Sequence, residues 1–88
     1  MKIEKYLFEK GIKPHLKGFD YLIQAIEICQ KDKSVLRKIT TELYPTIAKI
    51  NNDTPSRSAR AIRHAISTSK ENVSNSEFIG RAVIELED

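Results

Sequence analysis

The sequence predicts a small all-α domain of about five to six helices over residues 1–88, containing a helix-turn-helix near residues 45–69. Two observations predict this fold. Apolar residues recur at intervals of three and four along most of the chain, and this spacing places side chains on one face of an α-helix. In addition, no stretch of useful length alternates apolar and polar residues as a half-buried β-strand does.

The composition suits one soluble domain with a modest core, because 40% of the 88 residues are hydrophobic and 31% are charged. One cysteine, Cys29, excludes an internal disulfide and fits a reducing cytosol. The N-terminus does not read as a signal peptide, and no apolar run is long enough to span a bilayer. We therefore expect a cytoplasmic protein with no membrane partner.

The first two helices are predicted at residues 2–10 and from Phe19 onward, joined by a loop that contains Pro14 and is bracketed by glycines. Phe19, Leu22, Ile26 and Cys29 form one apolar stripe. Cys29 is therefore interpreted as a small buried apolar residue.

The third helix is predicted to begin after Ser34 as its N-cap, and its apolar stripe would extend to Ile50. Pro45 interrupts that stripe. Proline lacks a backbone donor and disfavours the α conformation at Tyr44, so a break or kink is expected there. A new short helix is then expected from Pro45 to about Asn51.

Two further helices have clear start signals. Thr54 as N-cap and Pro55 as the first helical residue predict a helix that runs to about Ser69. Ser74 and Glu77 have the spacing of a capping box for a final helix. The apolar face of that helix is predicted to consist of Phe78, Ile79, Ala82, Val83 and Leu86.

The helix after Thr54 carries cations on one side only. Between residues 54 and 70 there are four bases and no acid, whereas residues 85–88 include three acids. With Arg57 at 0°, Arg60, Arg63 and His64 fall at about 300°, 240° and 340°, for a rotation of about 100° per residue. Ile62, Ile66 and Ala59 fall on the opposite side. Such a face needs a counter-charge from outside the helix.

A short helix, a polar turn and a second helix with an exposed cationic face are typical of a DNA-binding helix-turn-helix. Arg57 and Arg60 lie in the first two turns, where side chains reach base edges, and an arginine can donate two hydrogen bonds to guanine. Ser56 and the helix N-terminus could meet a phosphate. From spacing alone, two alternatives stay open: a solvated surface, and pairing with acids elsewhere in the fold such as those at the C-terminus.

The segments YPTIAKINNDTPSRSARAIRHAI (44–66), GIKPHLKGFDYLIQAIE (11–27), LRKITTELYP (36–45) and NSEFIGRAV (75–83) together resemble the C-terminal effector domain of stage zero sporulation protein A. The resemblance implies a compact all-helical domain that binds double-stranded DNA at a TGNCGAA-like box, typically as tandem copies. It also implies DNA contacts by Ser56, Arg57, Arg60 and Arg63, and His64 matches as well.

Three departures from the family accompany this resemblance. Ser58 and Ala59 stand where the family usually has an apolar residue and a glutamate, which makes the face more cationic and could relax or alter sequence preference. The segment before NSEF is shorter than in the family, which puts the packing of the last helix in doubt. No receiver domain is present, so we expect that phosphorylation does not act in cis on this chain, whether it is a stand-alone relative or a fragment.

The sequence therefore predicts a non-enzymatic transcriptional regulator without cofactor or metal, since His15, Cys29 and His64 lack metal-ligand spacing. The predicted base contacts are Arg57, Arg60 and Arg63. The predicted partners are double-stranded DNA, a second copy in a dimer or tandem arrangement, and a full-length sporulation regulator. The alternative is a protein-interaction module that modulates such a regulator without reading DNA. The predicted DNA-backbone contacts are Ser56, Lys49, Thr54, His64 and Lys70.

Overall fold

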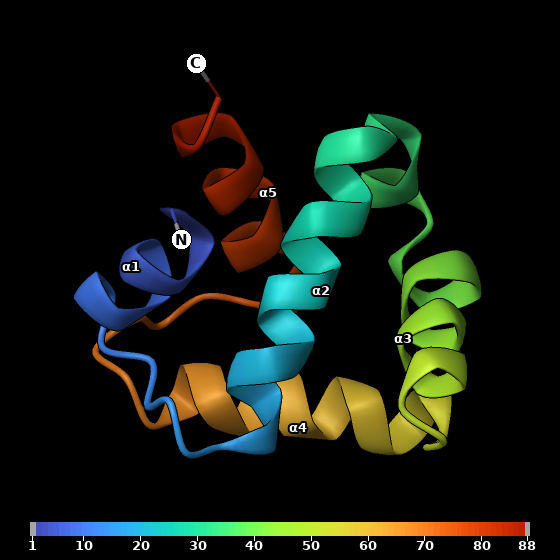
Figure 1. The fold of residues 1–88 in the computed structure, drawn as a ribbon, viewed down its shortest axis with the longest axis horizontal. Coiled ribbons are helices and arrows are strands. Elements are labelled where there is room, and N and C mark those ends of the chain that lie inside the picture. Colours follow the sequence, from blue (N-terminus) through green and yellow to red (C-terminus); the bar gives the residue numbers. More distant parts are fainter. Residues whose placement is uncertain (1, 88) are drawn as a thin grey trace.

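The computed structural model describes residues 2–87, and all regular secondary structure in that range is helical (Figure 1). A 3₁₀ turn and a π turn join the second and third of the α-helices. The predicted all-α fold is confirmed. The elements are α1 (Lys2–Glu9), α2 (Lys17–Lys31), the 3₁₀ turn η1 (Lys33–Arg37), the π turn η2 (Ile39–Leu43), α3 (Tyr44–Ile50), α4 (Pro55–Ser67) and α5 (Asn75–Glu85).

Helix α2 is the central element, because every other α-helix packs against it. In Figure 1 it rises from α4 at the bottom, with α1 and α5 on its left and α3 on its right. Cys29 is fully buried on α2, as predicted. No helix within residues 2–87 combines the length and the apolar character needed to cross a membrane. The buried stripe of α2 consists of Phe19, Leu22, Ala25, Ile26 and Cys29.

The lower end of α2 approaches α4 so closely that a glycine is required. A Cβ atom on Gly18 would lie 2.2 Å from the carbonyl oxygen of Ala61 and 2.7 Å from the Cβ of Ala65. The sequence placed Gly18 in a loop and the start of this helix at Phe19. The structure instead begins α2 at Lys17, so Gly18 lies in its first turn and serves helix packing.

The segment after α2 corrects the predicted third helix. Ser34 is not an N-cap. Instead, Asp32 Oδ1 accepts hydrogen bonds from the Ser34 backbone N–H (3.0 Å) and hydroxyl (2.6 Å) and caps the short 3₁₀ turn η1. An aspartate is as good a cap as a serine, and its carboxylate here satisfies two donors of Ser34 at once.

The break expected at Pro45 takes the form of the π turn just before it. There the Leu43 N–H donates to the carbonyl of Lys38 at 3.1 Å, five residues back. Tyr44 nevertheless adopts the α conformation (φ −62°, ψ −42°), so that part of the prediction is wrong. Pro45 fits because it lies in the first turn of α3, where no backbone donor is needed. Ile50 is 60% exposed, because the buried side of α3 is centred on Ile47 and Ala48.

The predicted caps of the last two helices are confirmed. Thr54 Oγ1 accepts the Arg57 N–H at 3.2 Å, and Ser74 Oγ accepts the Glu77 N–H at 3.1 Å. The Glu77 carboxylate pairs with Arg81 (2.6 Å), so the capping box has only its serine half. The shorter connection still allows α5 to pack on α2. Four of its predicted apolar residues are buried: Phe78, Ile79, Ala82 and Val83.

The α2–α4 packing predicts opposite effects for two glycine-to-alanine changes. Gly18→Ala forces the helices apart and should lower the free energy of unfolding by about 1–3 kcal/mol, as overpacking does. Gly80→Ala is the control, because a Cβ there meets nothing within 4 Å. It should stabilise α5 by up to about 1 kcal/mol. Urea unfolding followed by circular dichroism measures both, and a Gly18→Ala variant as stable as the parent would contradict this packing.

Candidate nucleic-acid interface

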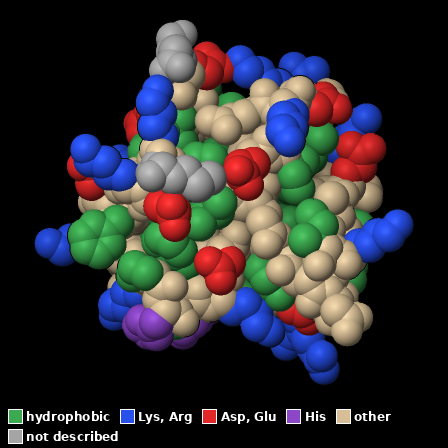
Figure 2. Space-filling view, viewed as in Figure 1, with side chains coloured by type: hydrophobic (Ala, Val, Ile, Leu, Met, Phe, Trp, Pro, Cys, Tyr) green, Lys and Arg blue, Asp and Glu red, His purple; other side chains and the backbone are tan. Residues whose placement is uncertain are grey.

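The outward side of α4 holds the predicted cations. Ile62, Ala65 and Ile66 are buried on its inner side. The predicted site residues on the rest of the surface lie as follows: Lys49 is exposed in the last turn of α3, and Lys70 is exposed in the connection after α4. In Figure 2, Lys, Arg and His side chains gather along the lower edge, where Figure 1 places α4. The exposed predicted residues at the start and along the outer side of α4 are Thr54, Ser56, Arg57, Arg60, Arg63 and His64.

No carboxylate neutralises this face within the part of the chain that the structure describes. None of the α4 arginines forms an ion pair in residues 2–87. Two of the three acids near the C-terminus are used elsewhere: Glu85 binds Tyr6 (2.6 Å) and Lys10 (3.7 Å), and Glu87 pairs with Lys33. The third, Asp88, lies outside the described residues. These two glutamates therefore do not supply the counter-charge that the sequence left open.

The turn between α3 and α4 has a well-defined backbone. Asn52 adopts a left-handed conformation (φ 53°), and the Asp53 N–H donates to the carbonyl of Ala48 at 2.8 Å. This pattern ends α3 as a Schellman motif, with an asparagine in the position that glycine often occupies. Asp53 Oδ1 then accepts the Thr54 N–H at 2.8 Å. The turn therefore fixes the angle at which α4 leaves α3.

Side chains of α2 hold this turn in place by hydrogen bonds. The Tyr21 hydroxyl donates to Asp53 Oδ2 at 2.7 Å, and Lys17 Nζ lies 3.6 Å from the same oxygen. One turn further along α2, Gln24 and Asn51 exchange two amide hydrogen bonds (2.7 and 3.3 Å). These contacts were not predicted from the sequence. The signal was the one-turn spacing of Tyr21 and Gln24 beside the apolar stripe.

The Tyr21–Asp53 contact changes both pKa values. The hydrogen bond from Tyr21, followed by the one from the Thr54 N–H, holds the pKa of Asp53 below its usual range. Burial, followed by the hydrogen bond and the charge of Asp53, raises the pKa of Tyr21 to about 12. The turn is therefore most stable when Asp53 is ionised and Tyr21 is neutral.

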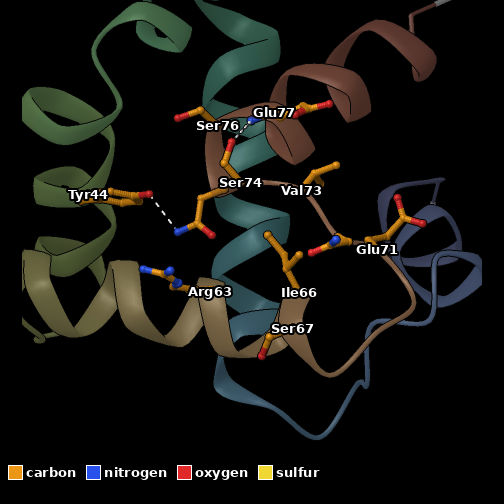
Figure 3. A pocket seen from close by; sticks show the side chains of 11 residues that line it. Tyr44, Arg63, Ile66, Ser67, Glu71, Val73, Ser74, Ser76 and Glu77 are labelled. Carbon is orange, nitrogen blue, oxygen red and sulfur yellow. Dashed lines mark hydrogen bonds between the residues drawn. The ribbon is translucent and has the colours of Figure 1, made fainter.

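Asn75, at the start of α5, holds the opposite side of α4. Its amide Nδ2 donates to the Ala59 carbonyl (3.1 Å) and to the Tyr44 hydroxyl (3.0 Å), which links α4, α3 and α5. Beside this contact is an open hollow of about 700 Å³. Arg63 lines this hollow, and its side chain lies below the hydrogen bond of Tyr44 (Figure 3). Arg63 thus lies at the margin of the cationic face, next to α5.

Ser58 lies on the inner side of α4, where the sequence analysis had placed only apolar anchors. It is fully buried, and its hydroxyl has no hydrogen-bond partner in the described structure. Leaving a buried hydroxyl unpaired costs about 1–3 kcal/mol. An apolar side chain of similar size at this position would avoid this cost. Ala59, predicted as an anchor, is only partly buried.

A short helix, a four-residue turn and a second helix with a cationic outer face have the arrangement of a helix-turn-helix, which is typical of DNA-binding domains. The family model described as "Sporulation initiation factor Spo0A C terminal" matches residues 3–85 of the chain. The chain belongs to this family, which comprises DNA-binding regulatory domains of sporulation and is not a family of enzymes. The resemblance seen in the sequence is confirmed.

The hydrogen bond between Tyr21 and Asp53 predicts that Tyr21→Phe lowers the free energy of unfolding by an amount that depends on pH. Because the pKa of Asp53 is lowered in the folded state, its contribution to stability is present above the usual aspartate pKa and is lost as the pH falls through the lowered value. Tyr21→Phe should therefore destabilise the protein clearly at neutral pH, and progressively less as the pH falls below the usual aspartate pKa of about 4.

Tyr44→Phe is the matched control, because the Tyr44 hydroxyl accepts from an amide and no carboxylate is involved. Its cost should not vary over the same pH range. Urea unfolding of both variants at pH 7 and pH 2.5 measures the difference. A Tyr21→Phe penalty that is the same at both pH values would show that Asp53 does not depend on this hydrogen bond.

Proposed function

We propose that the chain is a transcriptional regulator that binds double-stranded DNA sequence-specifically, with α4 in the major groove of a TGNCGAA-like box. The observation that carries this proposal is the unpaired arginine face of α4, held at a fixed angle by the Asp53 turn. The helix has a diameter of about 10–12 Å with side chains, and the major groove is about 12 Å wide. DNA phosphates would supply the missing counter-charge.

The roles proposed for the side chains follow from their positions. Arg57 and Arg60, near the start of α4, would read guanines through paired hydrogen bonds. Arg63 is nearer the end of the helix and at its margin, so it would take a flanking base or a phosphate. The residues proposed to position the DNA backbone are Ser56, Lys49, Thr54, His64 and Lys70.

One module of this size would bury limited area on DNA, so useful affinity would need two copies on adjacent boxes. A second copy, as a dimer or in tandem, is therefore part of the proposal. Because the proposed target is chromosomal DNA, we also infer a cytoplasmic location.

A second candidate function is binding to a full-length sporulation regulator without reading DNA. It is favoured by two large apolar side chains that are exposed on the helices furthest from the turn: Phe8 on α1 (66%) and Ile84 on α5 (68%). Light scattering after size exclusion, alone and mixed with the regulator, tests this role. Absence of a complex at micromolar concentration would exclude it.

Arg60→Ala should reduce discrimination between a matched duplex with two TGTCGAA boxes and a scrambled duplex by about 5- to 150-fold. This range corresponds to the roughly 1–3 kcal/mol of a bidentate arginine–guanine contact. Fluorescence anisotropy measures both affinities. Arg37→Ala is the control, because Arg37 is equally a surface cation but lies in η1, at the other end of α2. If Arg60→Ala kept the full preference for the boxes, the proposed readout would be wrong.

Lys49→Ala should weaken binding to matched and scrambled duplexes by the same factor, because a phosphate contact carries no sequence information. The slope of log affinity against log salt should become shallower by about 0.9, the loss of one phosphate contact. Anisotropy titrations at several salt concentrations give both quantities. A change in box preference with no change in slope would instead assign Lys49 to base recognition.

A further inference from the structure

A second cationic element lies alongside α4. Residues 12–17, here named the basic loop, comprise the last part of the connection between α1 and α2 together with Lys17, the first residue of α2. They are fixed along α4 at three points. Gly11, just before the loop, lies against Ser69 beyond the end of α4, where an added Cβ would be 3.6 Å from the serine Cβ. Gly18, just after it, lies against the middle of α4. Lys17 reaches Asp53, just before α4 begins. The basic loop therefore runs antiparallel to α4.

The basic loop is ordered by the core and presents its cations outward. Ile12 is buried (1% exposed), and Leu16 packs against the core. The Ile12 N–H donates to the Leu7 carbonyl at 3.0 Å. Lys13, His15 and Lys17 are exposed at every second position. A ligand that bound these side chains would not have to order the backbone, so the entropic cost of binding would be small.

The charges near the loop favour an anionic partner. Lys13 and His15 form no ion pair within residues 2–87. Lys17 pairs with Asp53, whose carboxylate also accepts hydrogen bonds from the Tyr21 hydroxyl and the Thr54 N–H. Acids lie beyond both ends of the loop: Glu9 and Glu71 line a small hollow at the Gly11 end, and Asp20 is exposed in the first turn of α2. The lower left of Figure 2 shows histidine side chains close to lysine or arginine at this edge of the α4 face.

The contacts on each side of α4 show along which flank of this helix the basic loop lies. Gly18 lies against Ala61 and Ala65, and these positions adjoin Arg57 and His64 on the helical wheel. The other flank is covered by Asn75, which binds the Ala59 carbonyl. The basic loop therefore borders the cationic face on the Arg57–His64 side, and α5 borders it on the other.

We propose that the basic loop is a phosphate-binding element, which grips the backbone of one DNA strand beside the groove that α4 occupies. A helix nearly fills the width of the major groove, so a segment packed on its flank meets the sugar-phosphate wall. Lys13, His15 and Lys17 contact successive phosphates of that strand. Lys49, on α3, contacts the backbone from a different element. This inference rests on the proposed DNA-binding function.

Lys13→Gln tests the proposal, because this side chain is exposed and forms no ion pair with the described residues whose loss would disturb the fold. The variant should bind matched and scrambled duplexes more weakly by the same factor, with a log–log salt slope shallower by about 0.9. Lys31→Gln is the matched control. It removes one exposed lysine from the opposite end of α2, and its slope should equal that of the parent.

A second readout locates the contact. Neutral methylphosphonates are placed one at a time along each strand of the matched duplex. For the parent protein they should reduce affinity at two or three neighbouring positions on one strand. Lys13→Gln should lose its sensitivity at one of these positions, and Lys31→Gln should keep it. Such coupling is not expected from a change in stability or in overall charge.

The outcomes separate the two proposals. If the parent protein shows no binding to either duplex, the DNA-binding function and this inference both fail. A second outcome is that the parent protein binds DNA and Arg60→Ala loses box preference, whereas Lys13→Gln keeps the parent salt slope and methylphosphonate profile. In that case the DNA-binding function stands, and only the proposal that the basic loop binds phosphates is overturned. A shallower slope with a lost methylphosphonate effect at one phosphate establishes the contact.

Discussion

The contact between Gly18 and Ala61 is the constraint on which the rest of the structure depends. Without a side chain at Gly18, the first turn of α2 can rest on the backbone of α4. From that contact, Tyr21 and Gln24 lie about one and two turns along α2, where they reach the ends of the turn between α3 and α4. The same contact brings the basic loop alongside α4. One close approach of two helices therefore sets the position of the cationic face and of its neighbours.

The cationic face lowers the stability of α4, and the packing of the helix against the rest of the protein offsets this loss. Three arginines without acids repel one another on a helix of 13 residues, and the unpaired hydroxyl of Ser58 weakens the same helix from its inner side. Three features oppose these effects: the burial of Ile62 and Ile66, the cap formed by Thr54, and the hydrogen bond from Asn75 to the Ala59 carbonyl. The protein thus holds its like charges together through packing, which is the arrangement expected of a surface whose counter-charges lie on a partner.

The sequence predicted much of this molecule, because most of its signals are local. Helical spacing and the caps at Thr54 and Ser74 placed α4 and α5 correctly, and the cationic side of α4 followed from its periodicity. The sequence-based predictions failed where contacts with other residues, and not the local pattern, determine the conformation. The closeness of Gly18 to Ala61 and the bonds of Asn75 depend on helices far apart in sequence. Ser34 was predicted as a cap, whereas Asp32, two residues earlier, caps η1. The π turn before Pro45 has no signal in the composition.

The central claim is that this scaffold presents the outer side of α4 to DNA. The most direct measurement is a titration of the ¹⁵N-labelled chain with a matched duplex, followed by two-dimensional amide spectra at each step. If α4 binds the DNA, the largest shifts occur at the amides of Arg57, Arg60 and His64, with further shifts along the basic loop. Shifts confined to the surroundings of Phe8 and Ile84, with the amides of α4 unchanged, would contradict the central claim.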